Sequence, residues 1–253
     1  MICDAHVHVG WYNCRGNGGL RYFSPRRVFG VLNRCGVAEW IVSSTSAQAD
    51  GITIEGLLDE AREIKRIAGK RAHLFCWLTW NLYRDDPSLN ILDCGMYEGI
   101  KLHEIEGRWV ARHKQELDVV LDYAREHELP VQFHSGIDMS CRPMTLMEVA
   151  ARHPKVRFDF AHCRLMPEMA AVMGQCYNVW TDTAYLSQED FGRLHEYDWY
   201  GRLMFGTDIP VWQTEKDMHL TRRYRWYVRS FKGTGMNVEA AFGSFLQTKK
   251  ERK

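Results

Sequence analysis

Hydrophobic and polar positions along the chain follow two patterns that succeed each other repeatedly. Short apolar runs with the length of buried strands are followed by segments with apolar residues at helical spacing. The runs predict eight strands, over residues 1–8, 39–44, 72–79, 99–104, 131–134, 156–162, 178–183 and 202–208. The helical spacing predicts helices from Pro25 to Gly36, over 54–68, near 87–92, over 115–128, 145–152, 167–176 and 188–200, and after Pro210.

Strands that alternate with helices are typical of a parallel sheet, and eight such units in 253 residues match the size of a (β/α)8 TIM barrel. We therefore predict an α/β protein with one barrel domain over residues 1–253, and a helical segment of about 211–253 that packs on the barrel. The segment Gly10–Phe23 is rich in glycine and aromatic residues, which predicts a loop over the barrel mouth. A doubly wound open sheet is the alternative, but no glycine-rich phosphate loop follows the first strand.

Composition narrows the partners and the compartment. The formal net charge is +1, so neither nucleic acid nor a charged membrane is indicated as a partner, and a small-molecule substrate remains. No apolar run reaches the length of about 18 residues that spans a bilayer. The eight cysteines form no Cys-x-x-Cys pair, and the first predicted strand begins at Met1, which argues against a secretory signal. We expect a reduced, cytoplasmic protein.

The first strand ends in the pattern Asp4-x-His6-x-His8. Strict alternation along a strand would place these three side chains on one face and the residues between them on the other. Two imidazoles two residues apart can grip a single metal ion, although a His-x-His pair also arises by chance. The rest of the chain therefore has to decide between a metal site and ordinary polar residues.

Later predicted strands end in the same kind of side chain, and in a barrel these ends meet at one face. The residues at these ends are Lys101, His103, His134, His162, Asp182 and Asp208. Each alone is more typical of packing or a turn, but several imidazoles with a carboxylate form the donor set that Zn²⁺ prefers. The combination predicts a metal centre at the barrel mouth.

The order of these motifs resembles the amidohydrolase superfamily, in particular the amidohydrolase-2 branch with its aminocarboxymuconate-semialdehyde decarboxylase-like enzymes and lactonases. The resemblance spans about residues 1–210 and rests on Asp4-Ala-His6-Val-His8, Gly99-Ile-Lys101-Leu-His103, Val131-Gln-Phe-His134, Phe160-Ala-His162-Cys and Phe205-Gly-Thr-Asp208-Ile-Pro210. The chain departs from the branch in its last helix, which lacks a Gly-Asn-Ala element, and it is shorter than the decarboxylases usually are.

The resemblance implies a role for each of these positions. His6, His8 and His134 match metal ligands, and Asp208 matches a ligand that also shuttles the proton of the attacking water. His162 matches a histidine that contacts this water or the substrate. Asp4 is expected to support the site without binding the metal.

Three further residues are assigned to the substrate. Lys101 occupies the position where some members of the superfamily carry a carboxylated lysine that bridges two metals. In this branch a contact with a substrate carboxylate is expected instead, so one divalent ion is predicted, for which Zn²⁺ and Mn²⁺ both suit. His103 shares the face of Lys101, and Arg164 stands where glycines are common, which makes it a candidate for binding an anionic group.

The predicted function is a metal-dependent hydrolase that uses an activated water on a small ester, lactone or amide, with a carboxylate on the substrate as a further feature. The main alternative is a metal-dependent, non-oxidative decarboxylase of a small unsaturated or aromatic carboxylic acid. A nuclease or phosphoesterase would usually have a glutamate at the position of Lys101 and a basic mouth, and a pure binding role would not need every metal-site position filled. Barrels of this kind commonly form homodimers, which is an analogy only.

Overall fold

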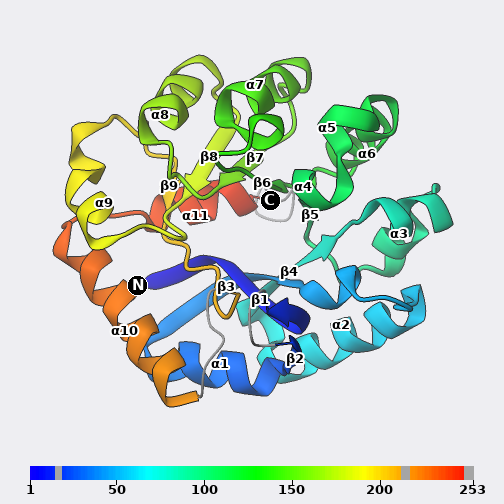
Figure 1. Cartoon of the computed structure of the whole chain (residues 1–253), viewed down its shortest axis with the longest axis horizontal. Coiled ribbons are helices and arrows are strands. Elements are labelled where there is room, and N and C mark those ends of the chain that lie inside the picture. The colour runs from blue at the N-terminus through cyan, green and yellow to red at the C-terminus, as the bar shows by residue number, and fades with distance from the viewer. Residues whose placement is uncertain (15–18, 212–216, 248–253) are drawn as a thin grey trace, which may run out of the picture.

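A computed structural model gives the structure of the chain and describes residues 1–14, 19–211 and 217–247 (Figure 1). Each of the eight predicted strands overlaps an observed one. The strands are β1 (Ile2–Cys14), β2 (Gly19–Phe23), β3 (Val37–Ser44), β4 (Ala72–Trp77), β5 (Gly99–Leu102), β6 (Val131–His134), β7 (Phe158–Ala161), β8 (Val179–Asp182) and β9 (Leu203–Met204). They form one sheet in the order β2-β1-β3-β4-β5-β6-β7-β8-β9, in which every pair except β1–β2 is parallel.

The segment predicted as a loop after Gly10 is instead an antiparallel hairpin. β1 continues to Cys14, and its second half pairs with β2 from Gly10–Phe23 to Cys14–Gly19. Aromatic residues favour a pleated surface, and here this preference outweighs the glycines that suggested a loop. The hairpin places Trp11 and Tyr12 beside the cavity described below.

The parallel strands curl, and helices lie around the outside of the sheet (Figure 1). At one edge the main chain after β9 returns to β1. The amide of Ala5 donates to the carbonyl of Phe205, and the amide of His8 donates to the carbonyl of Ile209, each over 2.7 Å. In return the amide of Asp208 donates to the carbonyl of His6 over 2.7 Å. These bonds fix the two histidines of β1 beside Asp208.

The helices begin where the sequence carries capping residues. Ser24 accepts a hydrogen bond from the amide of Arg27, and Pro25 occupies the first turn of α1. The helices are α1 (Pro25–Arg34), α2 (Ile54–Ala68), α3 (Trp80–Asp85), α4 (Glu104–Gly107), α5 (Trp109–Arg112), α6 (Lys114–Glu126), α7 (Pro143–Arg152), α8 (Met166–Gln175), α9 (Gln188–Arg193), α10 (Asp217–Gly233) and α11 (Glu239–Leu246). The helix predicted near 87–92 is a 3-10 turn over Asn90–Cys94, and the one predicted over 188–200 ends in a 3-10 turn at Glu196.

The interior of the sheet is apolar at its N-terminal end. Side chains from the starts of the strands form one cluster there, and α11 packs against it. Its members are Cys3, Ala5, Ile41, Phe75, Trp180, Met204, Ala241, Phe242 and Phe245. Gly99 begins β5 beside this cluster, where a Cβ atom would lie 2.5 Å from the Phe75 ring, so only glycine fits. This end is therefore a packed core and leaves the other end for polar groups.

The C-terminal segment contains α10 and α11 where it is described. Tyr224, Tyr227 and Phe231 share one side of α10 and are buried against the rest of the chain. The remaining parts of the predicted segment, 212–216 and 248–253, lie outside the described residues. The seven cysteines whose side chains are described form no disulfide. No helix within the described ranges has the length and apolar character needed to cross a membrane.

Candidate metal centre and active site

A cavity of about 590 Å³ opens at the C-terminal ends of the strands. All eight residues that the sequence assigned to metal, catalysis or substrate line it: His6, His8, Lys101, His103, His134, His162, Arg164 and Asp208. Trp11, Tyr12, Trp77 and Tyr185 supply aromatic walls. The structure thus brings together residues from both ends of the chain at one site, as parallel strands with a common direction require.

Asp4 does not share the face of His6 and His8, contrary to the prediction from alternation. The pairing of β1 with β3 shifts register between Asp4 and Val7, which breaks the two-residue period. The Asp4 carboxylate is buried and accepts hydrogen bonds from the hydroxyls of Thr207 and Tyr224, each over 2.7 Å. It also accepts from the amides of Thr207 (3.1 Å) and His6 (3.0 Å). Asp4 therefore ties β1 to the segment that carries Asp208.

Three side-chain atoms converge at the floor of the cavity. Nε2 of His6 lies 3.1 Å from Nε2 of His8, and Oδ1 of Asp208 lies 2.9 Å from Nε2 of His8 and 3.5 Å from Nε2 of His6. All three residues are buried, and one ligand atom from each lies within 4.8 Å of the others. This is a spacing from which a single cation can be bound.

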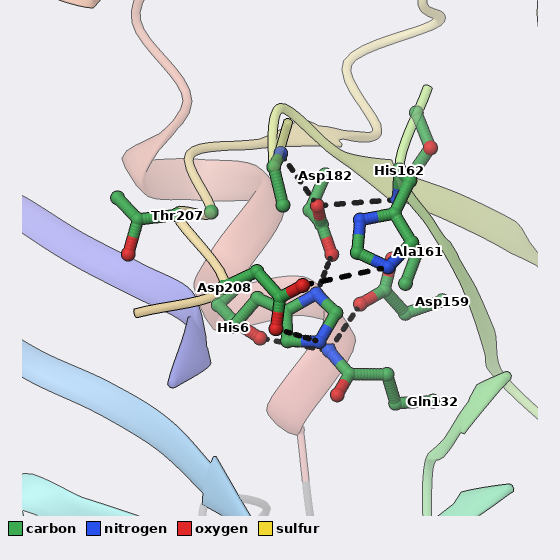
Figure 2. Close-up of polar contacts among 12 residues, drawn as sticks. His6, Gln132, Asp159, Ala161, His162, Asp182, Thr207 and Asp208 are labelled. Carbon is green, nitrogen blue, oxygen red and sulfur yellow. Dashed lines mark hydrogen bonds and ion pairs between the residues drawn. The ribbon is translucent and has the colours of Figure 1, made fainter. Parts of the chain in front are cut away.

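The hydrogen bond on the far side of the His6 ring shows which of its nitrogens holds the proton. Nδ1 of His6 donates to Oδ2 of Asp182 over 2.8 Å (Figure 2). Nδ1 of His8 lies 3.0 Å from the hydroxyl oxygen of Ser43, which can donate or accept, and 3.3 Å from the Ser43 carbonyl oxygen, which can only accept. Nδ1 of His6 therefore carries the proton, and its Nε2 presents a lone pair to the cavity floor. Burial and the charge of Lys101 lower the pKa of His6 well below its usual value, which keeps this ring neutral.

Asp208 completes the set and supports the fit to a metal. Its Oδ1 atom is buried and has no hydrogen-bond partner assigned among the described residues, while Nε2 of His8 lies 2.9 Å away and Nε2 of His6 lies 3.5 Å away. A divalent cation would neutralise this buried carboxylate and bind the imidazole nitrogens beside it. The second nitrogen of His6 is bonded to a carboxylate, a pattern common among metal-ligating histidines. The residues present thus fit a Zn²⁺ or Mn²⁺ ion.

His162 lies over this cluster. Its ring stacks on that of His6 with centroids 4.8 Å apart, and its Nε2 is 4.0 Å from Oδ2 of Asp208. Burial and the neighbouring His6 lower the pKa of His162 well below its usual value. His162 and Asp208 both have left-handed backbones, with φ of 71° and 58°. Such conformations cost energy in residues other than glycine and concentrate at functional sites.

His134 and His103 form a second pair of rings in the cavity wall. Their centroids are 4.0 Å apart, and His134 meets the edge of His162 at 5.0 Å. Burial and His162 lower the pKa of His134 well below its usual value. The ligand clusters found among the described residues do not include His134. Its role as a metal ligand therefore stays a prediction, as does the contact of His103 with substrate.

The two predicted substrate-binding cations lie in different surroundings. Nζ of Lys101 is 3.2 Å from Nε2 of His6, and only 1% of Lys101 is exposed. Burial lowers the pKa of Lys101 against the opposing charges of Asp208 and other buried aspartates. Arg164 is exposed at the cavity wall, where its guanidinium carbon lies 5.4 Å from the centre of the Tyr185 ring. Both side chains line the cavity, and their contact with a substrate stays a prediction.

Two residues of the site carry no assignment from sequence reasoning. Asp182 was noted only as a strand-end aspartate, yet it holds Nδ1 of His6 and accepts a hydrogen bond from the amide of Ala184 over 2.8 Å. Tyr185, in a left-handed conformation with φ of 65°, packs on His162 at 5.3 Å. An aspartate at the end of a buried strand was the available signal for Asp182, and no local pattern marks Tyr185.

Comparison with known proteins agrees with this geometry. The family model described as "Amidohydrolase", of the amidohydrolase-2 type, matches residues 94–224, just over half of the chain. The chain belongs to this amidohydrolase family. It is thus an enzyme of the metal-dependent hydrolase superfamily, as the sequence motifs predicted. A comparison with curated proteins finds no match.

Solved structures show that the fold of this amidohydrolase is a known one. A probable 2-pyrone-4,6-dicarboxylic acid hydrolase from Acinetobacter baumannii, with citric acid bound, matches with a TM-score of 0.65 and 11% identity over 97% of this chain and 98% of that chain. Amidohydrolase 2 from Bifidobacterium longum subsp. infantis matches with a TM-score of 0.64 and 12% identity, over 97% of this chain and 98% of that chain. A TatD-like protein from Archaeoglobus fulgidus matches with a TM-score of 0.61 and 13% identity, over 97% of this chain and 100% of that chain. At these identities the likeness concerns the fold, an α/β architecture with a curled parallel sheet and TIM-barrel neighbours.

Proposed function

We propose that this amidohydrolase uses one divalent metal ion to hydrolyse a small ester, lactone or amide. The observation that carries the proposal is the convergence of Nε2 of His6, Nε2 of His8 and Oδ1 of Asp208 at the floor of the cavity. These three residues would hold the ion, with His134 as the further ligand. The bound ion would supply a Lewis acid that makes water nucleophilic near neutral pH.

Asp208 is the proposed proton carrier. Its carboxylate faces the cavity, and its second oxygen lies toward His162. As water adds to the acyl carbon, Asp208 accepts the water's proton as general base. It returns that proton to the oxygen or nitrogen that leaves when the acyl bond breaks, as general acid. The acid and the leaving alcohol or amine are then the products.

His162 is proposed to stabilise the oxyanion that forms on the substrate carbonyl. The low pKa that burial gives this ring keeps it neutral, so one of its nitrogens bears a proton that can be donated. A donor already held in a buried site stabilises developing charge without reorganising. Its Nε2 lies 4.0 Å from Oδ2 of Asp208, at the floor of the same cavity.

Lys101, His103 and Arg164 are proposed to bind the substrate, including a carboxylate where one is present. The cavity of about 590 Å³ suits a small molecule. The structural neighbour from Acinetobacter baumannii is named as a hydrolase of a pyrone dicarboxylic acid, which supports a lactone with acidic groups as one substrate type.

The remaining proposals concern architecture and location. The bonds between β1 and residues 205–209 support a closed (β/α)8 barrel formed by the eight parallel strands, with residues 1–253 as one domain. The unpaired thiols of the seven described cysteines support a reducing, cytoplasmic compartment.

The test is a screen of the Zn²⁺- or Mn²⁺-loaded protein against small lactones, esters, amides and carboxylic acids. We expect water to be incorporated into the product of a lactone, ester or amide, detected with ¹⁸O-labelled water. Release of CO₂ from a carboxylic acid without incorporation of ¹⁸O would contradict the proposal and support a decarboxylase. Activity on phosphodiesters alone would also contradict it.

A further inference from the structure

A row of buried polar side chains crosses the sheet interior beneath the metal centre. Lys101 on β5 is paired in register with Gln132 on β6, and Gln132 is paired with Asp159 on β7. None of the three is more than 1% exposed. Buried ionisable groups in the middle of a sheet cost folding energy that apolar side chains would not. The row therefore calls for an explanation beyond packing.

Gln132 fixes the position of Asp159. Its Nε2 donates to the carbonyl oxygen of Ala5 and to Oδ2 of Asp159, each over 2.8 Å. Because the Ala5 carbonyl can only accept, this bond settles which end of the amide faces β1. Both hydrogens of the amide are then used, and Asp159 is held from one side.

Asp159 in turn meets Asp182 on the next strand. Oδ1 of Asp159 is buried and has no donor among the described residues, and Asp159 pairs in register with Trp180, two residues before Asp182 on the adjacent strand β8. The effect of Asp182 on the pKa of Asp159 includes a side-chain hydrogen bond between the two carboxyls. Two acceptors in such contact need a proton between them. Burial and the neighbouring Asp182 raise the pKa of Asp159 well above its usual value, so Asp159 is the acid that donates.

Asp182 connects Asp159 to the metal centre through its hydrogen bond with His6. Its Oδ2 accepts from Nδ1 of His6 over 2.8 Å, and its Oδ1 accepts from the amides of His162 (3.3 Å) and Ala184 (2.8 Å). Figure 2 shows the contact of Gln132 with Asp159 and the contact of Asp182 with His6. The direction of the His6 lone pair thus depends on a series of contacts that begins two strands away.

We propose that Asp159 is a positioning residue that, through Asp182, holds His6 in the tautomer and orientation in which its Nε2 binds the metal. The inference rests on the proposed metal site for its consequence, but the contact between Asp182 and His6 exists without any ion. Asp159 is neither among the residues that line the cavity nor among the converging ligand residues. Its effect on His6 is therefore indirect and passes through Asp182.

The experiment compares Asp159→Ala with Asp159→Asn and with a matched control. Asn can still accept from Gln132 and donate to Asp182, whereas Ala can do neither. The control is Thr181→Val, which removes a buried hydrogen bond of 2.7 Å from Thr181 to the Phe160 carbonyl between the same two strands. Each variant is titrated with Co²⁺ alone and followed by its visible absorption, and each is unfolded in urea.

We expect Asp159→Ala to weaken Co²⁺ binding by about 10- to 100-fold, as loss of an outer hydrogen-bond partner of a metal ligand does. Asp159→Asn and Thr181→Val are expected to stay within about threefold of the parent, even where their stability falls. Equal Co²⁺ affinity in Asp159→Ala and the parent would overturn the proposal. An equal loss in Thr181→Val would do so too. If Asp159→Ala does not fold, Gln132→Met replaces it, with the same direction of change expected.

A second readout separates this proposal from the proposed function. In the metal-free protein, the Nδ1 proton of His6 bonded to Asp182 should give a downfield NMR resonance, assigned by its absence in His6→Gln. We expect it in the parent and in Asp159→Asn and expect its loss in Asp159→Ala. Its persistence in Asp159→Ala contradicts the positioning role whether or not metal binds. A parent that shows the resonance but binds no Co²⁺ contradicts the metal site instead.

Discussion

The two ends of the sheet interior differ in almost every physical property. The N-terminal end is a cluster of apolar side chains, including Phe75 and Phe245, against which α11 packs. The C-terminal end holds buried imidazoles and carboxylates around a cavity, with left-handed backbones at His162 and Asp208. One end gains stability from burial, and the other carries polar groups whose burial costs stability. We therefore expect substitutions at the N-terminal end to lower the stability of the fold, and substitutions at the C-terminal end to impair metal binding or catalysis.

The largest expected effect is on activity, from Asp208→Asn at the C-terminal end. Asparagine tolerates the left-handed backbone but cannot take up a proton. We expect kcat/KM on any substrate found in the screen to fall by about 10²- to 10⁴-fold. Steady-state kinetics at saturating metal measures this. A variant within a few fold of the parent would mean that Asp208 carries no proton in the reaction.

At the N-terminal end, Phe245→Ala should act on stability alone. The ring is fully buried against Phe75 and Trp180. We expect unfolding in urea to show a loss of about 3–5 kcal/mol, the usual cost of such a cavity. The Co²⁺ affinity of the folded protein should stay within about threefold of the parent. A large change in that affinity would show that the two ends are coupled.

Two glycines offer a matched comparison of the ends. A Cβ on Gly206 would lie 2.8 Å from Cβ and Cγ of Asp182, and a Cβ on Gly99 would lie 2.5 Å from the Phe75 ring. Both Gly→Ala variants should lose about 1–3 kcal/mol through overpacking. Only Gly206→Ala should also weaken Co²⁺ binding, by about tenfold, because it displaces the partner of His6. Equal Co²⁺ affinities in the two variants would contradict the separation.

The smallest expected effect is a pH dependence of stability at the N-terminal end. His73 lies near Phe242 and is bonded to Glu98 (2.8 Å) and Glu39 (3.2 Å). Burial disfavours its charged form, but the bonds to the two glutamates outweigh this and raise the pKa of His73 above its usual value. The stabilisation is full below the unfolded pKa of about 6.5 and is lost as pH rises through the folded pKa.

His73→Gln removes this titration. We expect the free energy of unfolding of the parent to exceed that of the variant by about 1 kcal/mol or less at pH 5.5, since the glutamates are partly exposed. This difference should shrink toward pH 8.5. Urea unfolding at the two pH values measures it, with Co²⁺ affinity as the control readout. A difference that grows with pH would show that the sign of the pKa shift is wrong.

The sequence predicted the strand and helix order well because the apolar runs and their capping residues are local signals. Ser24 with Pro25 marked the start of α1, and the strand-end residues other than Asp182 line one cavity. The prediction that Asp4 shares a strand face with His6 and His8 was wrong, because the order of residues does not reveal the register shift in β1. The hairpin after Gly10 was missed since its glycines dominated the local pattern.

The hydrogen bond from His6 to Asp182 could not be predicted from the sequence for a different reason. Asp182 lies 176 positions away in the chain, and only the closing of the sheet brings it to the ring. Asp159 and Gln132 are polar residues within apolar runs, a pattern that is compatible with burial but does not identify their partners. The ligand atoms are thus marked in the sequence, whereas the hydrogen bonds that orient them depend on the register of the strands.

The most direct test of the metal centre is a calorimetric titration of the metal-free protein with Zn²⁺, alongside His8→Ala. We predict that the parent binds one ion per chain. His8→Ala, which removes one of the converging lone pairs but no partner of His6 in the Asp182 network, should bind at least about 100-fold more weakly. Phe245→Ala serves as the folded control with parental binding. Absence of binding in the parent, or equal binding in His8→Ala, would contradict a metal centre at His6, His8 and Asp208.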